Sequence, residues 1–337
     1  MIRKKGLTLK LSILDQSPKS TGTTSKEALE ASLKLAQLGD ELGYTRYWIA
    51  EHHDMKGLSC PAPDIMLSMI GSKTDRIRIG SGAVLLPHYK PFNVAERFNL
   101  LATLFPNRID LGIGRAPGGS AEASIALSGN FLENVRQVPE DLDDLNSFFA
   151  GSFPKENMYS KISPTPVPEI PPQIWLLGTS EKSGQLAVEK QLPYTFGHFM
   201  SEANGPEIVK KYKNDIHNDD ILKNQPPIIA VSVICAETTE KAQNLSLSAL
   251  GWSILGGKEY DGVPSIDEVN RHAFTQEEKD KMTKQRKNMI IGNPKEVKEQ
   301  LEFLQDLYQT DEFMIITITH DYDARRNSYE LLAHEIL

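Results

Sequence analysis

The order of the expected elements constrains the fold of this chain more than any other feature of its sequence. Short apolar runs, typical of buried strands, alternate along the chain with segments of helical periodicity. Such alternation predicts parallel strands connected by helices, and eight units in 337 residues favour a closed (β/α)8 barrel. The predicted strands are Leu9–Leu14, Arg46–Ala50, Ile77–Leu86, Arg108–Ile113, Ile174–Leu177, Tyr194–Gly197, Ile228–Cys235 and Glu312–Thr319.

The alternative to a barrel is an open, doubly wound sheet, which usually carries a glycine-rich turn after its first strand. The segment after the first predicted strand is LDQSPKSTG, and it contains no G-x-G-x-x-G turn. A proline-rich stretch at residues 154–172 is a candidate domain boundary, but in a barrel we interpret it as a long loop between a strand and the next helix. We therefore expect one α/β domain over residues 1–337, a TIM barrel with insertions in its βα loops.

Charge and cysteine content exclude several classes of protein. The chain has 37 Lys and Arg against 45 Asp and Glu, and its formal net charge of −8 disfavours nonspecific binding to nucleic acid or to anionic membranes. It contains no run of about 18 apolar residues, so no membrane-spanning segment is expected. Two cysteines, Cys60 and Cys235, are too few for a disulfide scaffold or a thiolate metal cluster, which favours the reducing cytoplasm.

The catalytic residues of a (β/α)8 barrel lie where its strands end, and one predicted strand ends in two histidines. The segment is RYWIAEHH, which finishes at Glu51, His52 and His53. A histidine at this place can act as a general acid, a general base or a hydrogen-bond donor at neutral pH. No H-E-x-x-H motif accompanies the pair, so no metal site is predicted. A pair of hydrogen-bonded histidines without a catalytic role is the alternative.

Three other strand ends carry motifs suited to ligand binding. Gly80 and Gly82 within one strand indicate either close approach by a ligand or a bent barrel corner. Arg115, flanked by glycines, suits a phosphate, a carboxylate or a ring carbonyl, or else a surface salt bridge. The turn GTSEKSG at residues 178–184 suits a phosphate at a helix N-terminus, although an ordinary serine N-cap has the same composition.

Taken together, these segments resemble the bacterial luciferase-like flavin-dependent monooxygenases. The resemblance rests on RYWIAEHH, on IGSGAVLLPHYKPFNVAERFNLLATLFPNRIDLGIGRAPGG, and on LLGTSEKSGQLAVEKQLPYTFGHF. The closest pattern is the bacterial subgroup with LDQSP after the first strand and GRAPG after the fourth, and it extends over essentially the whole chain. Luciferase itself has a cysteine just before the arginine of this motif, where this chain has Gly114, so light emission is not implied.

The resemblance implies a (β/α)8 barrel that uses reduced FMN and O2 to oxygenate a small organic substrate. It also implies a separate NAD(P)H-flavin reductase and a homodimer. The residues matched to the family motifs are a catalytic histidine, His52, and the cofactor-binding residues Gly82, Ala83, Arg115, Gly178, Ser180 and Ser183. Gly82–Ala83 matches a non-prolyl cis peptide beside the flavin ring, Arg115 an arginine near the phosphate and ribityl chain, and the two serines phosphate-binding hydroxyls.

Two alternatives of the same fold remain at this point. Relatives of the family use the deazaflavin F420 for hydride transfer, and some luciferase relatives are flavin-binding proteins without activity. A further question concerns residues 251–292, where luciferase carries a mobile loop over the flavin. Gly251, Gly256 and Gly257 would serve as hinges there, and Trp252 and Ile254 would cover the ring. A helical hairpin packed outside the barrel is the other expectation.

Overall fold

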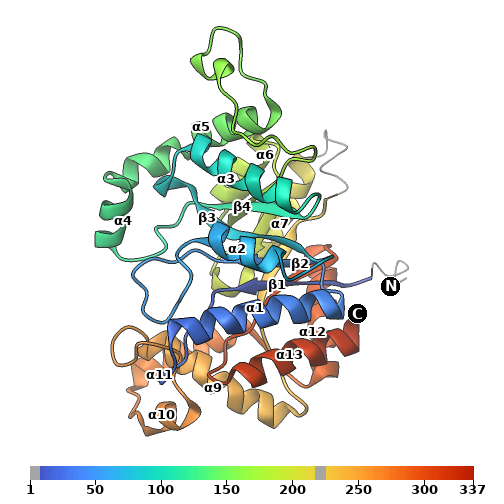
Figure 1. The fold of residues 1–337 in the computed structure, drawn as a ribbon. Coiled ribbons are helices and arrows are strands. Elements are labelled where there is room, and N and C mark those ends of the chain that lie inside the picture. Colours follow the sequence, from blue (N-terminus) through green and yellow to red (C-terminus); the bar gives the residue numbers. More distant parts are fainter. Residues whose placement is uncertain (1–7, 217–224) are drawn as a thin grey trace.

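The computed structural model describes residues 8–216 and 225–337, and these form a closed parallel barrel surrounded by helices (Figure 1). The barrel strands are hydrogen-bonded in chain order from β1 to β7, and β9 closes the ring between β7 and β1. The predicted (β/α)8 barrel is therefore confirmed. The strands are β1 (Lys10–Asp15), β2 (Arg46–Ile49), β3 (Arg78–Leu85), β4 (Ile109–Gly114), β5 (Gln173–Gly178), β6 (Tyr194–Gly197), β7 (Ile228–Cys235) and β9 (Glu312–Ile316).

One strand was absent from the sequence prediction. β8 (Met289–Gly292) pairs with Ser232–Cys235 of β7, beyond the stretch of β7 that pairs with β6. It therefore extends the sheet at the carboxyl end of β7 without becoming part of the closed ring. With only four residues, it is too short for a clear strand periodicity.

The helices begin and end at local signals that the sequence carries. Thr24 and Glu27 form a reciprocal capping box at the start of α1, and Gly43 ends that helix with a φ of +87°. The helices are α1 (Ser25–Leu42), α2 (Pro63–Gly71), α3 (Pro91–Leu104), α4 (Ala121–Ser128), α5 (Phe131–Ala150), α6 (Glu181–Glu189), α7 (Gly205–Asp215), α9 (Thr239–Leu255), α10 (Ile266–Arg271), α11 (Gln276–Arg286), α12 (Pro294–Tyr308) and α13 (Tyr322–Ile336). Within the described residues, none of these helices is long and apolar enough to cross a lipid bilayer.

The proline-rich stretch at 154–172 differs from its predicted position. It follows α5 and precedes β5, so it connects a helix to a strand and lies at the amino end of the barrel, away from the strand ends that carry the motifs. It projects at the top of Figure 1. The Asn99 side chain of α3 anchors it by donating to the Pro164 carbonyl at 2.7 Å. Because α5 precedes this stretch, the interpretation as a loop after a strand was wrong. The sequence predicts that helix over about Pro139–Ala150, whereas α5 begins at Phe131.

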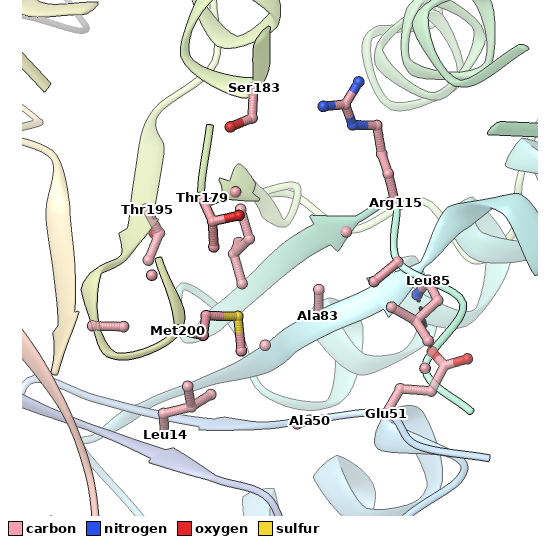
Figure 2. Close-up of a pocket in the computed structure, with 18 of the residues that line it drawn as sticks. Leu14, Ala50, Glu51, Ala83, Leu85, Arg115, Thr179, Ser183, Thr195 and Met200 are labelled. Atoms are coloured by element: carbon pink, nitrogen blue, oxygen red, sulfur yellow. Dashed lines mark hydrogen bonds between the residues drawn. The ribbon is translucent and has the colours of Figure 1, made fainter. Parts of the chain in front are cut away.

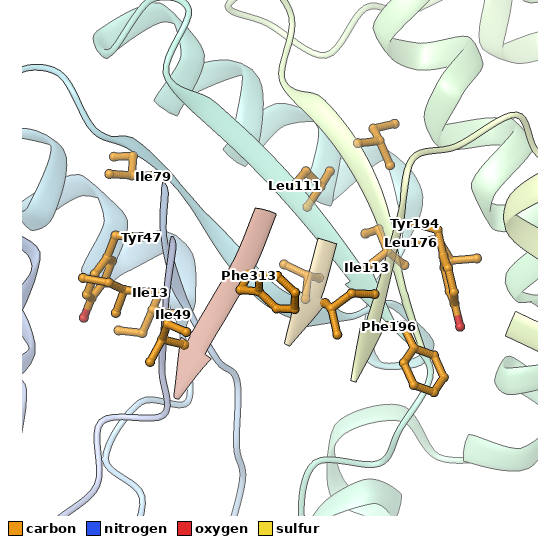
Figure 3. Close-up of a cluster of buried hydrophobic side chains, with 14 of the residues drawn as sticks. Ile13, Tyr47, Ile49, Ile79, Leu111, Ile113, Leu176, Tyr194, Phe196 and Phe313 are labelled. Carbon is orange, nitrogen blue, oxygen red and sulfur yellow. The ribbon is translucent and has the colours of Figure 1, made fainter. Parts of the chain in front are cut away.

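The strands alternate between two apolar layers. Ile13, Ile49 and Phe313 point outward, where the helices cover them (Figure 3), whereas Leu14 and Met314, the next residues after Ile13 and Phe313, point into the barrel. The interior layer also contains Trp48, Trp175, Ile228, Ala230 and Ile316. Since Leu14, Ala230 and Met314 belong to this interior layer and also line the cavity described below, the barrel core forms the floor of that cavity.

Charged residues fill the amino end of the barrel interior. Arg46 forms ion pairs with Asp110 at 2.7 Å and with Glu312 at 2.9 Å, and Arg78 forms one with Asp110 at 2.6 Å. Burial alone would raise the pKa of Asp110, but the two guanidinium groups hold it below its usual value. This network occupies the end of the barrel opposite the carboxyl ends of the strands. Within the described barrel interior, the space for a ligand therefore lies toward the carboxyl ends.

Candidate functional site

A cavity of about 300 Å³ opens among the carboxyl ends of the barrel strands (Figure 2). The side chains of β1, β7 and β9 form its floor, and the loops after β2, β4, β5 and β6 contribute to its wall. The structure brings all the residues matched to the family motifs to this one cavity: His52, Gly82, Ala83, Arg115, Gly178, Ser180 and Ser183. Four motifs that are far apart in the chain therefore belong to a single site.

One wall is the carboxyl half of β3. The Gly82–Ala83 peptide bond is cis, and the pairing of β3 with β4 shifts between Ser81 and Val84. A Cβ atom on Gly82 would lie 2.7 Å from Cδ1 of Leu14, so a larger residue would require the Leu14 side chain on the barrel floor to shift. A Cβ on Gly114 would lie 3.0 Å from that of Ala83. The two glycines thus allow this bent strand to form a smooth apolar wall.

The amino end of α6 lies at the opposite end of the cavity from Glu51 (Figure 2). Ser180 is the N-cap, and its hydroxyl accepts from the Ser183 amide at 3.4 Å. The Ser183 hydroxyl donates to the Ser180 carbonyl at 2.6 Å and lies 2.9 Å from the Tyr194 hydroxyl. A Cβ on Gly178 would lie 2.2 Å from both Cβ and Oγ of Ser183, so this glycine lets α6 begin directly against β5.

Arg115 brings positive charge to the same end of the cavity. Its guanidinium and the Ser183 hydroxyl lie together at that end in Figure 2. Among the residues that the structure describes, no carboxylate lies within ion-pair distance of Arg115, so the surface salt bridge considered above does not form. A guanidinium and the first turn of a helix both attract anions. This end of the cavity can therefore hold a phosphate or another anion.

His52 follows β2 and lines the cavity at some distance along its wall. Burial, with a smaller contribution from neighbouring His53, lowers the pKa of His52 to about 4. The ring is therefore neutral at pH 7. Its Nδ1 atom is buried and has no hydrogen-bond partner among the described residues. A neutral imidazole with an unpartnered nitrogen can hydrogen-bond a ligand or accept a proton from it.

Glu51 is a site residue to which the sequence assigned no role. Its buried carboxylate accepts from the Tyr89 hydroxyl at 2.9 Å and from the Leu85 amide at 3.1 Å, and it lies 2.7 Å from Nε2 of His53. It thereby ties the end of β3 to the loop after β2, and it orients His53 toward itself. His53 does not line the cavity. An acidic residue beside two histidines was visible in the sequence, but its partners are far away in the chain.

Two further groups, Asp15 and the two cysteines, lie outside the cavity. Asp15, at the end of β1, forms a buried ion pair with Arg325 at 2.7 Å and accepts a hydrogen bond from Tyr47. Cys60 and Cys235 are buried, and burial raises the pKa of each thiol to about 12, so neither is a reactive thiolate. In the described part of the chain, no group of three or more His, Cys, Asp or Glu side chains is arranged to hold a metal ion.

Residues 251–292 form helices beside the site, and none of them lines the cavity. Trp252 packs against Gly57, where a Cβ atom would lie 2.9 Å from the indole. Val263 pairs with the loop after β1, through hydrogen bonds with Lys19 and Thr21. α10 and α11 lie at the lower left of Figure 1 and pack on α9. The expected contact of Trp252 and Ile254 with the cavity is therefore absent from this conformation.

Comparison with known proteins gives a match over most of the chain. The family model for luciferase-like monooxygenases matches residues 9–311. The uncharacterized protein YceB of Bacillus subtilis (strain 168) is 40% identical over 328 residues, 97% of this chain and 99% of that protein. The N-acetyl-S-alkylcysteine monooxygenase of the same organism is 33% identical over 333 residues, 98% of each chain. The oxygenase component of a flavin-dependent trigonelline monooxygenase from Acinetobacter baylyi is 20% identical, with 93% and 90% covered.

Solved structures share the fold over nearly the whole chain. Apo-MsnO8 superposes with a TM-score of 0.85 at 30% identity, covering 97% of this chain and 98% of that one. The oxygenating constituent of 3,6-diketocamphane monooxygenase from Pseudomonas putida, in complex with FMN, gives 0.71 at 18% identity, with 98% of each chain covered. An F420-dependent secondary alcohol dehydrogenase gives 0.71 at 12% identity, with 98% and 100% covered. The last two likenesses are likenesses of fold alone.

Proposed function

This chain belongs to the luciferase-like monooxygenase family, and on that basis we propose that it binds reduced FMN and transfers one oxygen atom of O2 to a small organic substrate. The observation that carries the proposal is the composition of the cavity at the carboxyl ends of the strands. An anion-binding end, an apolar middle and a neutral histidine all line the same space. A flavin mononucleotide has a matching phosphate, aromatic ring and reactive edge.

The phosphate of FMN fits the end formed by α6 and Arg115. Ser180 and Ser183 would donate hydroxyl or amide hydrogen bonds to its oxygens, and Arg115 would neutralise its charge. The isoalloxazine ring fits the apolar part of the cavity, which is lined by Ala83, Leu14 and Met314. Glycines at 82, 114 and 178 keep this space free of side chains, which supports binding of a flat, extended ligand.

His52 is proposed as the catalytic residue. Its neutral ring enters the reaction able to accept a proton at Nδ1 or to donate a hydrogen bond from the other nitrogen, but at pH 7 it carries no proton to give away as an acid. Reduced FMN, when bound, supplies the two electrons with which O2 is activated. His52 would hold or move the proton that accompanies this change.

Exclusion of water is the second contribution of the cavity. Leu177, Phe199 and Met200 line it together with the barrel floor, so the reacting groups would be surrounded by apolar atoms. Water in such a site would destroy the activated oxygen before the substrate reacts. The N-acetyl-S-alkylcysteine monooxygenase, at 33% identity, supports an N-acetylated thioether as the first substrate to test.

We also propose two partners and a cytoplasmic location. A separate NAD(P)H-flavin reductase would supply reduced FMN, as the term oxygenase component in the name of the trigonelline relative suggests. A second copy of the chain would cover an exposed apolar stripe on the adjacent helices α2 and α3. The stripe consists of Ile65 and Met69 on α2 and Leu100 and Leu104 on α3, whose exposed fractions range from 49% to 64%. The two buried, unpaired cysteines suit the reducing cytoplasm.

The proposed function is tested by binding and by oxygen uptake. Quenching of flavin fluorescence should give saturable binding of FMN, whereas riboflavin and F420 bind more weakly. NADH-driven O2 consumption with an added flavin reductase should exceed the reductase-only control and should rise with an N-acetyl-S-alkylcysteine, with the sulfoxide as product. Preferential binding of F420, with hydride transfer from it, would identify the F420-dependent alternative. Tight FMN binding without oxygen transfer to any of a panel of thioethers, aldehydes and ketones would identify the inactive flavin-binding alternative.

A further inference from the structure

One buried hydroxyl of the cavity has no role in the site described so far. Thr195 lies on β6, only 2% of its surface is exposed, and its side chain lines the cavity. Its Oγ1 atom has no hydrogen-bond partner among the described residues. Seven buried side-chain polar atoms share that condition in the described chain, and only those of Thr195 and His52 belong to cavity-lining residues.

The barrel places these two unpartnered groups on opposite walls. In the ring of eight strands, β2 and β6 are separated by four positions on either side, and His52 directly follows β2 while Thr195 is on β6. Figure 2 shows Thr195 across the cavity from Leu85 and Glu51. A buried hydroxyl without a partner is destabilising. Both atoms are shielded from solvent by their surroundings, so a small rotation of each side chain would bring it to a polar atom of a ligand in the adjoining cavity.

The covalent structure of FMN decides which part of the ring would meet Thr195. The ribityl phosphate is attached at N10, and N1 and the C2 carbonyl lie on the same edge of the ring as N10. N5 and the C4 carbonyl lie on the opposite edge. With the phosphate at α6, which follows β5, the N10 edge would turn toward the wall that includes the neighbouring strand β6. The N5 edge would then turn toward β2 and His52.

We propose that Thr195 donates a hydrogen bond to the N1–C2 carbonyl edge of reduced FMN and so makes the site bind reduced FMN more tightly than oxidised FMN. The proposal rests on the proposed function. Reduction of FMN to its anion concentrates negative charge at N1 and the C2 carbonyl oxygen. A hydrogen bond to a charged acceptor is stronger than one to a neutral acceptor, so the Thr195 hydroxyl favours the reduced form.

The test compares Thr195→Val with Thr195→Ser. Dissociation constants for reduced FMN, under anaerobic conditions, and for oxidised FMN are measured with each protein. In Thr195→Val, the preference for reduced FMN should fall about tenfold, equivalent to a decrease of about 30 mV in the two-electron potential of bound FMN. Thr195→Ser keeps the hydroxyl and should keep most of the preference.

Stability without flavin provides an independent measurement. Because the Thr195 hydroxyl has no partner there, Thr195→Val should not lower the unfolding temperature of the flavin-free protein. Thr317→Val is the matched control, since the buried Thr317 hydroxyl donates to the Val233 carbonyl at 2.8 Å and does not line the cavity. That variant should unfold at a lower temperature and leave the preference for reduced FMN unchanged.

The outcomes separate this proposal from the proposed function. An unchanged preference in Thr195→Val, or equal weakening of both forms of FMN, overturns the role of Thr195 while FMN-dependent oxygen transfer stands. A loss of unfolding temperature as large as that of Thr317→Val also overturns it, because the hydroxyl would then have a partner in the protein. Absence of FMN binding by the unaltered protein overturns both proposals together.

Discussion

The hydroxyl oxygens of Ser183 and Tyr194 lie 2.9 Å apart, which connects the first turn of α6 to β6 beside the cavity. Burial raises the pKa of Tyr194 to about 12, although the Ser183 hydrogen bond and the charge of Arg115 oppose the rise. The phenol therefore stays protonated, and it can donate to Ser183. Ser183 can then direct its own hydrogen toward the Ser180 carbonyl or toward an anion bound at the helix end.

This arrangement gives a prediction for flavin selectivity. Replacing Ser180 and Ser183 by Ala should weaken FMN by roughly tenfold or more per lost charge-assisted hydrogen bond, and riboflavin far less, because only FMN carries a phosphate. Arg115→Ala should also weaken FMN, and its effect should shrink as salt rises if the contact is exposed to solvent. Fluorescence titration measures the dissociation constants of FMN and riboflavin for the serine and the Arg115→Ala variants. An equal loss for FMN and riboflavin would leave Ser180 as a helix cap alone.

His52→Ala should separate binding from turnover. The variant should bind FMN nearly as tightly as the unaltered protein, while turnover with substrate falls roughly 10²–10⁴-fold, the usual contribution of a general acid or base. His53→Ala is the matched control, because the His53 ring faces Glu51 and does not line the cavity. Stopped-flow and steady-state oxygen uptake measure both variants. Near-normal turnover in His52→Ala contradicts the assignment.

The lowered pKa of His52 predicts a pH dependence of stability. The pKa is about 4 in the folded protein and 6.5 for the unperturbed side chain, so between these values the unfolded chain binds more protons. Above pH 6.5 the His52 ring is neutral in both the folded and the unfolded state, so it costs no stability. As the pH falls from 6.5 toward 4, the free energy of unfolding decreases by up to roughly 3 kcal/mol. Urea unfolding at pH 7 and pH 4.5 checks this. The difference between the unaltered protein and His52→Asn should shrink or reverse at the lower pH, and a pH-independent difference would refute it.

The apolar stripe on α2 and α3 predicts a dimer that charge can disrupt. Leu104→Glu combined with Met69→Glu should raise the dimer dissociation constant at least tenfold, because an interface that buries these side chains must then bury charges. Phe303→Glu is the matched control, since Phe303 is 67% exposed on α12, outside the stripe. Sedimentation velocity over a range of concentrations measures the effect. Equal behaviour of the three proteins would exclude the stripe as the interface.

The strands of the barrel were predictable because a strand covered on both faces must be apolar along its length. β8 could not be predicted, since it has only four residues, two of them partly exposed, and it obtains its order from pairing with β7. The sequence predicts that this helix starts at Pro139, because proline is frequent in the first turn of a helix, whereas α5 starts at Phe131. Asn130 instead caps the helix by accepting from the Glu133 amide, and the buried Val138, Leu142 and Leu145 hold the helix through the proline.

The candidate site also has features that could be predicted from the sequence and features that could not. Glycines, the histidine pair and the lone arginine mark strand ends locally, so they could be assigned from the sequence to the rim of a barrel. The environment of each group depends on residues distant in the chain. The buried Glu51 side chain obtains its hydrogen bonds from Tyr89 and from the Leu85 amide. Thr195 is notable only because no group in the described chain forms a hydrogen bond with its hydroxyl. The amino-acid sequence alone contains no signal for a buried atom that lacks a hydrogen-bond partner.

Residues 251–292 provide the last prediction, in which α11 acts as a mobile cover of the cavity. α10 is fastened through Val269, which packs closely on Gly251, whereas no residue of α11 is buried. The exposed ion pair between Lys284 of α11 and Glu202 at 2.6 Å connects this helix to the loop that carries Phe199 and Met200 of the cavity wall. Exposed pairs contribute little stability, so α11 should detach readily.

Limited trypsin digestion followed by mass spectrometry tests the movement of α11. Cleavage after the lysines and the arginine of α11 should be fast without flavin and slower, several-fold, with reduced FMN and substrate under anaerobic conditions. The exposed Lys155 and Lys161, in the loop between α5 and β5 at the other end of the barrel, serve as an internal control whose cleavage should ignore both ligands. Lys284→Glu should accelerate cleavage of α11 in the ligand-free protein. Cleavage of α11 at the same rate with and without ligands would instead favour a static helical hairpin packed beside the barrel.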